Sequence, residues 1–138
     1  MRRRDVASLL ALGLVIWVVG TVLYSYRGEV IFESTSLRYW WAFASAPVFS
    51  AILCVIILRR RNIAPAQWAS AMLLLAIPGM IGEAVVLSNF STFMPKLHAA
   101  SGGPYGAFLF ATYGLVLALA EIVTLRAGRW TQEANAAD

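Results

Sequence analysis

Four long apolar runs alternate with short polar segments along this chain. The runs cover about residues 6–26, 38–58, 65–89 and 105–125. Each is close to the roughly 20 apolar residues that a helix needs to cross the hydrocarbon core of a bilayer. A helix is favoured there because it satisfies its backbone hydrogen bonds within itself. The pattern predicts an all-α, polytopic membrane protein, with a single domain over residues 1–130 that forms a bundle of four transmembrane helices, and a polar tail at residues 131–138.

The first apolar run follows a basic start, as it would in a secretory signal peptide. Residues 6–26 are nevertheless long enough for a full span, and no small-x-small cleavage pattern follows them. We therefore expect this run to be a retained first helix.

The basic residues are divided unevenly between the two ends of the predicted spans. Most of the 11 lysines and arginines lie beside the N-terminus, in the turn after the second span, or after the fourth span: Arg2, Arg3, Arg4, Arg59, Arg60, Arg61, Arg126 and Arg129. The opposite ends carry Arg27, Arg38 and Lys96. Because cytoplasmic loops carry the excess of lysine and arginine, both termini are predicted to be cytoplasmic.

The composition limits the classes of protein that fit the chain. It is 60% hydrophobic and 13% charged, whereas soluble domains carry about 25% charged residues, so a lipid bilayer must solvate part of it. The net charge of +4 lies in short clusters beside the apolar runs, which argues against nucleic acid as a partner. A single cysteine, Cys54, and a single histidine, His98, exclude an intrachain disulfide and a cysteine–histidine metal site. No metal or cofactor is expected.

The third run contains the most informative segment, residues 76–88, with the sequence AIPGMIGEAVVLS. An ionisable residue such as Glu83 is costly within a membrane and indicates a functional site by default. Pro78 should bend the helix, while Gly79 and Gly82 allow a neighbouring helix to approach closely. Helical spacing places Gly79 and Glu83 on one face, so the carboxyl is predicted to point into the bundle, about 9 Å below the outer end of its helix.

Two interpretations of Glu83 follow from the sequence. In the functional one, Glu83 binds a proton or a cation. In the structural one, it fixes the register of the helix through hydrogen bonds, with Thr21, Tyr24 or Tyr113 as partners. The candidate site therefore comprises these residues of the third and fourth spans: Glu83, Pro78, Gly79, Gly82 and Tyr113.

The fourth run has a stripe of small residues, which predicts a face for helix packing. The stripe consists of Ala107, Ala111, Gly114 and Ala118 and leads to Glu121. Small residues let helices approach closely within membranes. We therefore expect Gly114 to contact another span, and Glu121 to form an ion pair with Arg126 at the cytoplasmic rim.

The second half of the chain resembles a known family. The similarity covers roughly residues 76–120 and is carried by an ordered series of motifs: Pro78-Gly79-Met80, Glu83, Phe90, Phe93, Met94-Pro95-Lys96-Leu97, Tyr105-Gly106-Ala107-Phe108 and Ala111-Thr112-Tyr113-Gly114-Leu115. It is similar to small four-helix bacterial membrane proteins that are catalogued only as a domain of unknown function, in which the acid is often aspartate rather than the glutamate found here. The resemblance implies four spans and a multi-pass protein of the bacterial cytoplasmic membrane, and it implies no activity.

Three classes of function remain open. A structural or accessory module, which packs with itself or with a larger membrane complex, is favoured by the small-residue faces. The alternative is a small proton-coupled transporter that uses the glutamate in the membrane. Small multidrug resistance proteins are such chains, but their glutamate lies in the first span, where this chain has none. An enzyme acting on lipid or quinone is least supported because no catalytic set of residues converges, and we expect no enzyme.

Overall fold

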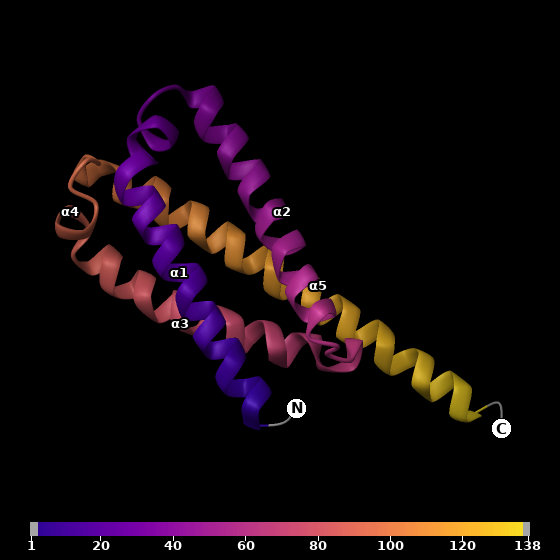
Figure 1. The fold of residues 1–138 in the computed structure, drawn as a ribbon. Coiled ribbons are helices and arrows are strands. Elements are labelled where there is room, and N and C mark those ends of the chain that lie inside the picture. The colour runs from indigo at the N-terminus through magenta and orange to yellow at the C-terminus, as the bar shows by residue number, and fades with distance from the viewer. Residues whose placement is uncertain (1–2, 137–138) are drawn as a thin grey trace.

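The computed structural model describes residues 3–136 and the side chains of residues 3–129, and this part of the chain is helical with short connections (Figure 1). The long helices are α1 (Arg3–Phe32), α2 (Ser36–Arg60), α3 (Trp68–Ser88) and α5 (Gly102–Ala136). Short elements lie between them: η1 (Pro65–Gln67), α4 (Phe90–Phe93) and η2 (Ala99–Ser101). Four segments within the described residues are long and apolar enough to cross a membrane, namely α1, α2, η1 with α3, and η2 with the first part of α5.

The predicted helices are present, but several of their boundaries differ. Helix α1 continues to Phe32, so much of the polar segment between the first two predicted spans is helical. The polar segment between the third and fourth apolar runs contains the short helices α4 and η2. Helix α5 continues to Ala136 through most of the predicted tail, and residues 137–138 lie outside the described part. Helices α2 and α3 continue through Pro47 and Pro78.

The two ends of the molecule are distinct. The start of α1, the turn between α2 and α3 and the last part of α5 lie toward one end, here called the terminal end (Figure 1). The α1–α2 connection and α4 lie at the other, the connector end. Helices α1 and α3 therefore run in the same direction, opposite to α2 and α5. The most extensive packing joins α1 to α3, followed by α2 to α5 and α3 to α5.

The contact between α1 and α3 depends on glycine. A Cβ atom added to Gly13 would overlap the carbonyl group of Leu75, so the two backbones meet directly. Small residues permit this approach between apolar helices. Around it lies the larger buried cluster, to which all four long helices contribute, with Leu9, Leu58, Met72 and Ala120 among its members.

The terminal end is held together by polar contacts to the turn between α2 and α3. Asn62 adopts the left-handed conformation, with φ of 52°, which asparagine tolerates better than most residues. The Trp68 indole donates to the carbonyl of Ile63 at 3.0 Å. Thr124 of α5 accepts from the backbone N–H of Ala69 at 3.0 Å and donates to the carbonyl of Pro65 at 3.2 Å. This hydroxyl satisfies a backbone donor in the first turn of α3 and ties α3 to α5.

The connector end is closed by aromatic packing. Tyr105 of α5 is fully buried in a second cluster with Val86, Phe90, Met94 and Leu97. Its ring makes edge contacts with the rings of Tyr24 and Phe32 of α1, at centroid distances of 5.9 and 5.5 Å. Such edge-to-face pairs stabilise beyond their buried area.

A carboxylate on the surface of this end joins two connections. Glu33, directly after α1, accepts hydrogen bonds from the hydroxyl of Ser101 and the backbone N–H of His98, both at 2.6 Å. The His98 imidazole is exposed and lies 4.0 Å from the same carboxylate.

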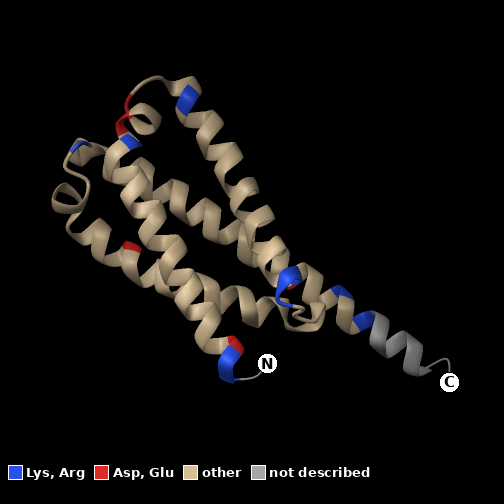
Figure 2. Cartoon of the chain, viewed as in Figure 1, with Lys and Arg blue, Asp and Glu red and all other residues tan. Residues whose placement is uncertain are grey.

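The charged residues lie mainly at the two ends, with apolar helix surface between them (Figure 2). Glu83 is the exception on α3, where a single acidic position interrupts an otherwise uncharged helix. Large apolar side chains cover the outer surface between the ends, including Val19, Phe49, Ile81 and Phe110, each more than 60% exposed. A continuous apolar surface of this kind is what lipid contact requires.

Candidate functional site

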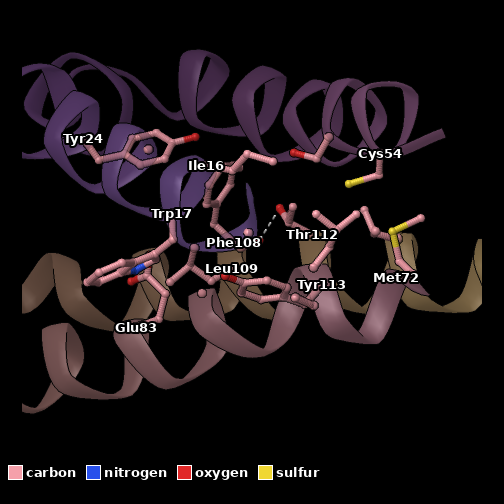
Figure 3. Close-up of a pocket in the computed structure, with 17 residues that line it drawn as sticks. Ile16, Trp17, Tyr24, Cys54, Met72, Glu83, Phe108, Leu109, Thr112 and Tyr113 are labelled. Carbon is pink, nitrogen blue, oxygen red and sulfur yellow. Dashed lines mark hydrogen bonds between the residues drawn. The ribbon is translucent and has the colours of Figure 1, made fainter. Parts of the chain in front are cut away.

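A chamber of about 190 Å³ lies among the four long helices (Figure 3). Each helix contributes to its wall: α1 through Trp17 and Tyr24, α2 through Ser50 and Cys54, α3 through Met72, Ala76, Gly79 and Glu83, and α5 through Phe108, Thr112 and Tyr113, among others. Glu83 lies at one end beside Trp17, and Cys54 and Met72 lie toward the other (Figure 3). The chamber thus has one acidic end and a largely apolar remainder.

Glu83 is buried, with 7% of its surface exposed. It shares a face of α3 with Ala76 and Gly79, which are also buried and also line the chamber. The orientation predicted from helical spacing is therefore found, and the carboxyl points away from the lipid-facing side of α3. Burial of a carboxyl group is unfavourable unless polar groups surround it.

Tyr105 provides the hydrogen bond to this carboxyl. Its hydroxyl donates to the two Glu83 oxygens, at 3.1 Å to Oε2 and 3.3 Å to Oε1. The hydroxyl has one proton, so it is shared between the two oxygens rather than bonded strongly to either. The contact is buried and links α3 to the first turn of α5.

Two further donors lie beside the carboxyl without completing a hydrogen bond. The indole Nε1 of Trp17 and the hydroxyl of Thr21 are buried and have no hydrogen-bond partner. Both are close enough to Glu83 to interact with its charge, but their geometry falls short of a hydrogen bond. Unsatisfied buried polar groups are rare and require an explanation. Glu83 therefore has two buried donors close by in addition to the Tyr105 hydroxyl.

The glycines of α3 make room for the aromatic wall of the chamber. A Cβ atom at Gly79 would overlap the Tyr113 hydroxyl, and one at Gly82 would overlap the Trp17 indole. Each ring therefore lies directly on the helix backbone one turn or less from Glu83. The predicted group of Glu83, Gly79, Gly82 and Tyr113 is brought together, while Pro78 is half-buried and is not among the residues that line the chamber.

The sequence suggested only some of the groups around Glu83. Thr21 lies beside the carboxyl as expected, but the hydrogen bond comes from Tyr105, and Trp17 is a further neighbour. The helix bounds of the structure explain the pairing, because Tyr105 lies three residues into α5 and Glu83 lies five residues before the end of α3. Side chains at similar distances from the same end of antiparallel helices lie at similar membrane depth.

The small-residue stripe of the fourth span requires a correction. Ala107, Gly114, Ala118 and Glu121 are exposed, and a Cβ atom at Gly114 would have no atom within 4 Å. The inward face of α5 instead carries buried side chains at Tyr105, Phe108, Val116 and Ala120. Larger side chains fill the space between helices and make more dispersion contacts there. Small side chains make few such contacts, so fewer are lost when they face outward.

The ion pair expected from Glu121 is likewise not formed in the described structure. Within the residues whose side chains are described, Glu121 makes no ion pair with Arg126, and both side chains are exposed. Glu121 instead borders a surface groove between α3 and α5 near the terminal end, with Ser70 and Leu73 opposite.

The fold and the chamber define the class: a small helical protein with four helices of membrane-spanning length and an acidic site among them. The chain belongs to a family of unknown function, DUF5367, whose model matches residues 31–127. The matched region contains Glu83, Tyr105 and Tyr113, whereas Trp17 and Thr21 of α1 precede it. No curated protein and no solved structure matches the chain.

Proposed function

We propose that the protein is a small proton-coupled carrier of the membrane, in which Glu83 binds either a proton or a cationic solute in the chamber. The observation that carries this proposal is the combination of a buried carboxyl, an adjoining cavity and two unsatisfied donors. A glutamate with a purely structural role would be expected to use the donors around it. Here two buried donors beside the carboxyl form no hydrogen bond, and a cavity adjoins the carboxyl, as a binding site requires.

The surroundings of Glu83 suit exchange between two charge states. With a proton bound, the carboxyl is neutral and tolerates an apolar environment. When the proton leaves, the Tyr105 hydroxyl, the Trp17 indole and the Thr21 hydroxyl can stabilise the carboxylate through small adjustments. A cation that enters then meets a negative charge and the faces of Trp17 and Tyr24, which attract cations. Proton and cation would thus compete for one group.

We also infer that the protein is a multi-pass protein of the bacterial cytoplasmic membrane, with its helices bundled and both termini inside. The distribution of basic residues supports this orientation, because Arg59 and Arg60 at the end of α2 and Arg61 directly after it belong to the terminal end. Lys96, between α4 and η2, belongs to the connector end. Cytoplasmic ends carry the excess of positive charge.

The test is proton movement driven by a permanently charged probe. Purified protein would be reconstituted into vesicles that contain a pH-sensitive dye, and benzyltrimethylammonium would be added outside. Wild-type protein should release protons from the vesicle as the cation enters, and Glu83→Gln should abolish this because the amide cannot bind a proton. Glu121→Gln, which alters an exposed acid on another span, should behave as wild type. Equal proton release from wild type and Glu83→Gln would refute the proposal.

A second candidate is a structural or accessory module that packs with itself or with a larger membrane complex. The outward position of Gly114 and Ala118 on α5 favours it, because this small-residue face has no partner within the described chain. Small-residue faces promote association of helices in membranes. Replacement of both residues by leucine should convert a dimer to a monomer, as measured by light scattering in mild detergent. A mass that does not change would remove this candidate.

A further inference from the structure

A second hollow, here called the lateral groove, meets the chamber at Glu83. It has a volume of about 110 Å³ and lies between α3 and α5. Its wall is formed by Met80, Glu83, Ala84, Leu87, Leu109, Phe110 and Tyr113. Apart from Glu83 and Tyr113, these side chains are entirely apolar.

The lateral groove and the chamber have three wall residues in common: Glu83, Leu109 and Tyr113. These side chains therefore separate the two spaces, and the carboxyl is reached from either side. The outer wall belongs to the lipid-facing surface, where Phe110 is 75% and Met80 is 41% exposed. Leu109 and Tyr113 are both half-buried and stand between the two spaces, so they are the side chains that would have to move for a solute to pass from one to the other.

Aromatic and apolar side chains cover the connector-end side of Glu83 in the described structure. Tyr105 and Met94 are fully buried there, and the rings of Phe90 and Phe32 pack directly on Tyr105. The loops and α4 thus form a plug of aromatic and apolar side chains above the carboxyl. A solute arriving from the aqueous phase at that end would have to displace this cluster.

We infer that the ligand of Glu83 is a small primary amine with a compact apolar body, which enters from the lipid through the lateral groove. This inference rests on the function proposed above and specifies its substrate class and route. The charge follows from the carboxyl, and the apolar body follows from the groove wall. The size follows from the chamber, because drug-sized ligands occupy pockets of roughly 300–1,000 Å³, larger than the 190 Å³ available here.

The proton step is balanced within the site. In water the amine is an ammonium ion, and it leaves that proton in the water when it enters the hydrocarbon region as its neutral base, because a charged ammonium is costly there. One proton is thus released for each amine that binds, as the proposed function requires. The proton of the neutral Glu83 carboxyl moves to the amine nitrogen, whose lone pair forms the new N–H bond. An ammonium and a carboxylate result, and Tyr105, Trp17 and Thr21 lie beside the carboxylate as donors.

The experiment compares the binding rates of a matched pair of probes, cyclohexylmethylamine and its alcohol isostere cyclohexylmethanol. The protein would be held in lipid nanodiscs, and binding would be followed by stopped-flow fluorescence of Trp17, which the Trp17→Phe variant identifies as the source of the signal. The amine should bind at least about tenfold more tightly than the alcohol because only the amine forms the ion pair. Ethanolamine, an amine without an apolar body, should bind as weakly as the alcohol.

The route is tested by filling the lateral groove. Ala84→Phe should slow association and dissociation by about tenfold with little change in their ratio, because it obstructs a path and leaves the site intact. Val85→Phe is the control, since Val85 is an exposed neighbour on α3 that is not part of the groove wall. Met80→Trp provides a second obstruction if Ala84→Phe fails to fold.

The outcomes separate the route from the proposed function. If both groove variants bind at the rate of Val85→Phe, the lateral route is wrong, and Glu83-dependent binding still stands. If ethanolamine or the alcohol binds as tightly as the amine, the substrate class is wrong. If Glu83→Gln binds the amine as wild type does, the proposed function fails, and the inference that rests on it fails too.

Discussion

At the scale of single residues, the contact between Tyr105 and Glu83 shows how a carboxyl is accommodated among apolar helices. The hydroxyl is shared between two oxygens at 3.1 and 3.3 Å, while the ring is held by edge contacts with Tyr24 and Phe32. Packing therefore fixes the donor, and the donor in turn fixes the carboxyl. Polar groups positioned by a rigid apolar shell are typical of sites that must keep one geometry.

Removal of the Tyr105 hydroxyl should destabilise the protein more when Glu83 is present than when it is replaced. Tyr105→Phe keeps the ring contacts and should lower the free energy of unfolding by about 1–3 kcal/mol, because it deprives a buried carboxyl of its donor. In a Glu83→Gln background the same change should cost less, since an amide is cheaper to leave unpaired. Thermal denaturation in mild detergent of the four proteins of this cycle measures the coupling. Tyr26→Phe, at an exposed tyrosine, serves as the control, and an equal loss in both backgrounds would contradict the assigned hydrogen bond.

Glu33 makes the stability of the connector end depend on pH. The Ser101 hydroxyl, followed by the His98 backbone N–H, holds the pKa of Glu33 below its usual value by donating hydrogen bonds to the carboxylate. A lowered pKa in the folded state adds stability that is fully present above the unfolded pKa and is lost as the pH falls through the folded pKa. The contribution should therefore be complete at neutral pH and absent in strong acid.

The pH dependence is measured as the difference in melting temperature between wild type and Glu33→Gln. That difference should be greatest at pH 7 and should vanish as the pH falls below the lowered pKa of Glu33. Glu29→Gln, at another acid near this end of α1, is the matched control variant and is measured at the same pH values. A difference between wild type and Glu33→Gln that is constant with pH would contradict the role of the ionised carboxylate.

At the scale of helices, the direct backbone contact between α1 and α3 lies at one glycine of α1. Gly13 lies against the carbonyl of Leu75, whereas Gly20 on the same helix has no atom within 4 Å of an added Cβ. Both glycines line the chamber, but only Gly13 is in contact with the backbone of α3. Close backbone approach is what allows α1 and α3, two apolar helices, to pack extensively.

Addition of one methyl group should therefore have opposite effects at these two positions. Gly13→Ala should destabilise the protein by about 1–3 kcal/mol, because the methyl group forces the helices apart. Gly20→Ala should be neutral or stabilising by up to about 1 kcal/mol, because alanine favours helix and nothing obstructs it. Thermal denaturation of the two variants in the same detergent measures the difference. Equal effects at Gly13 and Gly20 would show that the close contact does not govern this helix pair.

At the scale of the whole molecule, the two ends are built differently. The terminal end is joined by polar contacts, among them the hydroxyl of Thr124 and the hydrogen bond from Arg61 to Ser8 at 3.1 Å. The connector end is closed by the aromatic cluster around Tyr105, with the Glu33 contacts on its surface. In the proposed orientation the first end faces the cytoplasm and the second faces outward.

Cysteine labelling tests this orientation. In a Cys54→Ala background, His98→Cys should react with a membrane-impermeant maleimide in intact cells, because the His98 side chain is 88% exposed at the connector end. Ala66→Cys, at an exposed position in η1, should react only after the cells are permeabilised. The reverse pattern would show that the proposed orientation is inverted.

The sequence by itself determined the four helices and the prominence of Glu83. A bilayer core is a uniform apolar solvent, so the length of an apolar run is sufficient evidence for a spanning helix. The inward orientation of Glu83 was also predictable, since a carboxyl on the lipid-facing side would be costly. Gly79 and Gly82 could be assigned to the site around Glu83 because each lies within about one helical turn of it.

The tertiary structure alone decided how the other helices are rotated about their axes. Both sides of α5 are apolar, so hydropathy cannot distinguish a face that contacts lipid from one that contacts protein, and the small residues around Gly114 were assigned inward although they face outward. Packing of Tyr105 and Phe108 against α1 settles that choice. The donor to Glu83 depends on the same rotation. Apolar periodicity sets rotation in water because only one side can face the solvent, and in lipid that constraint is absent.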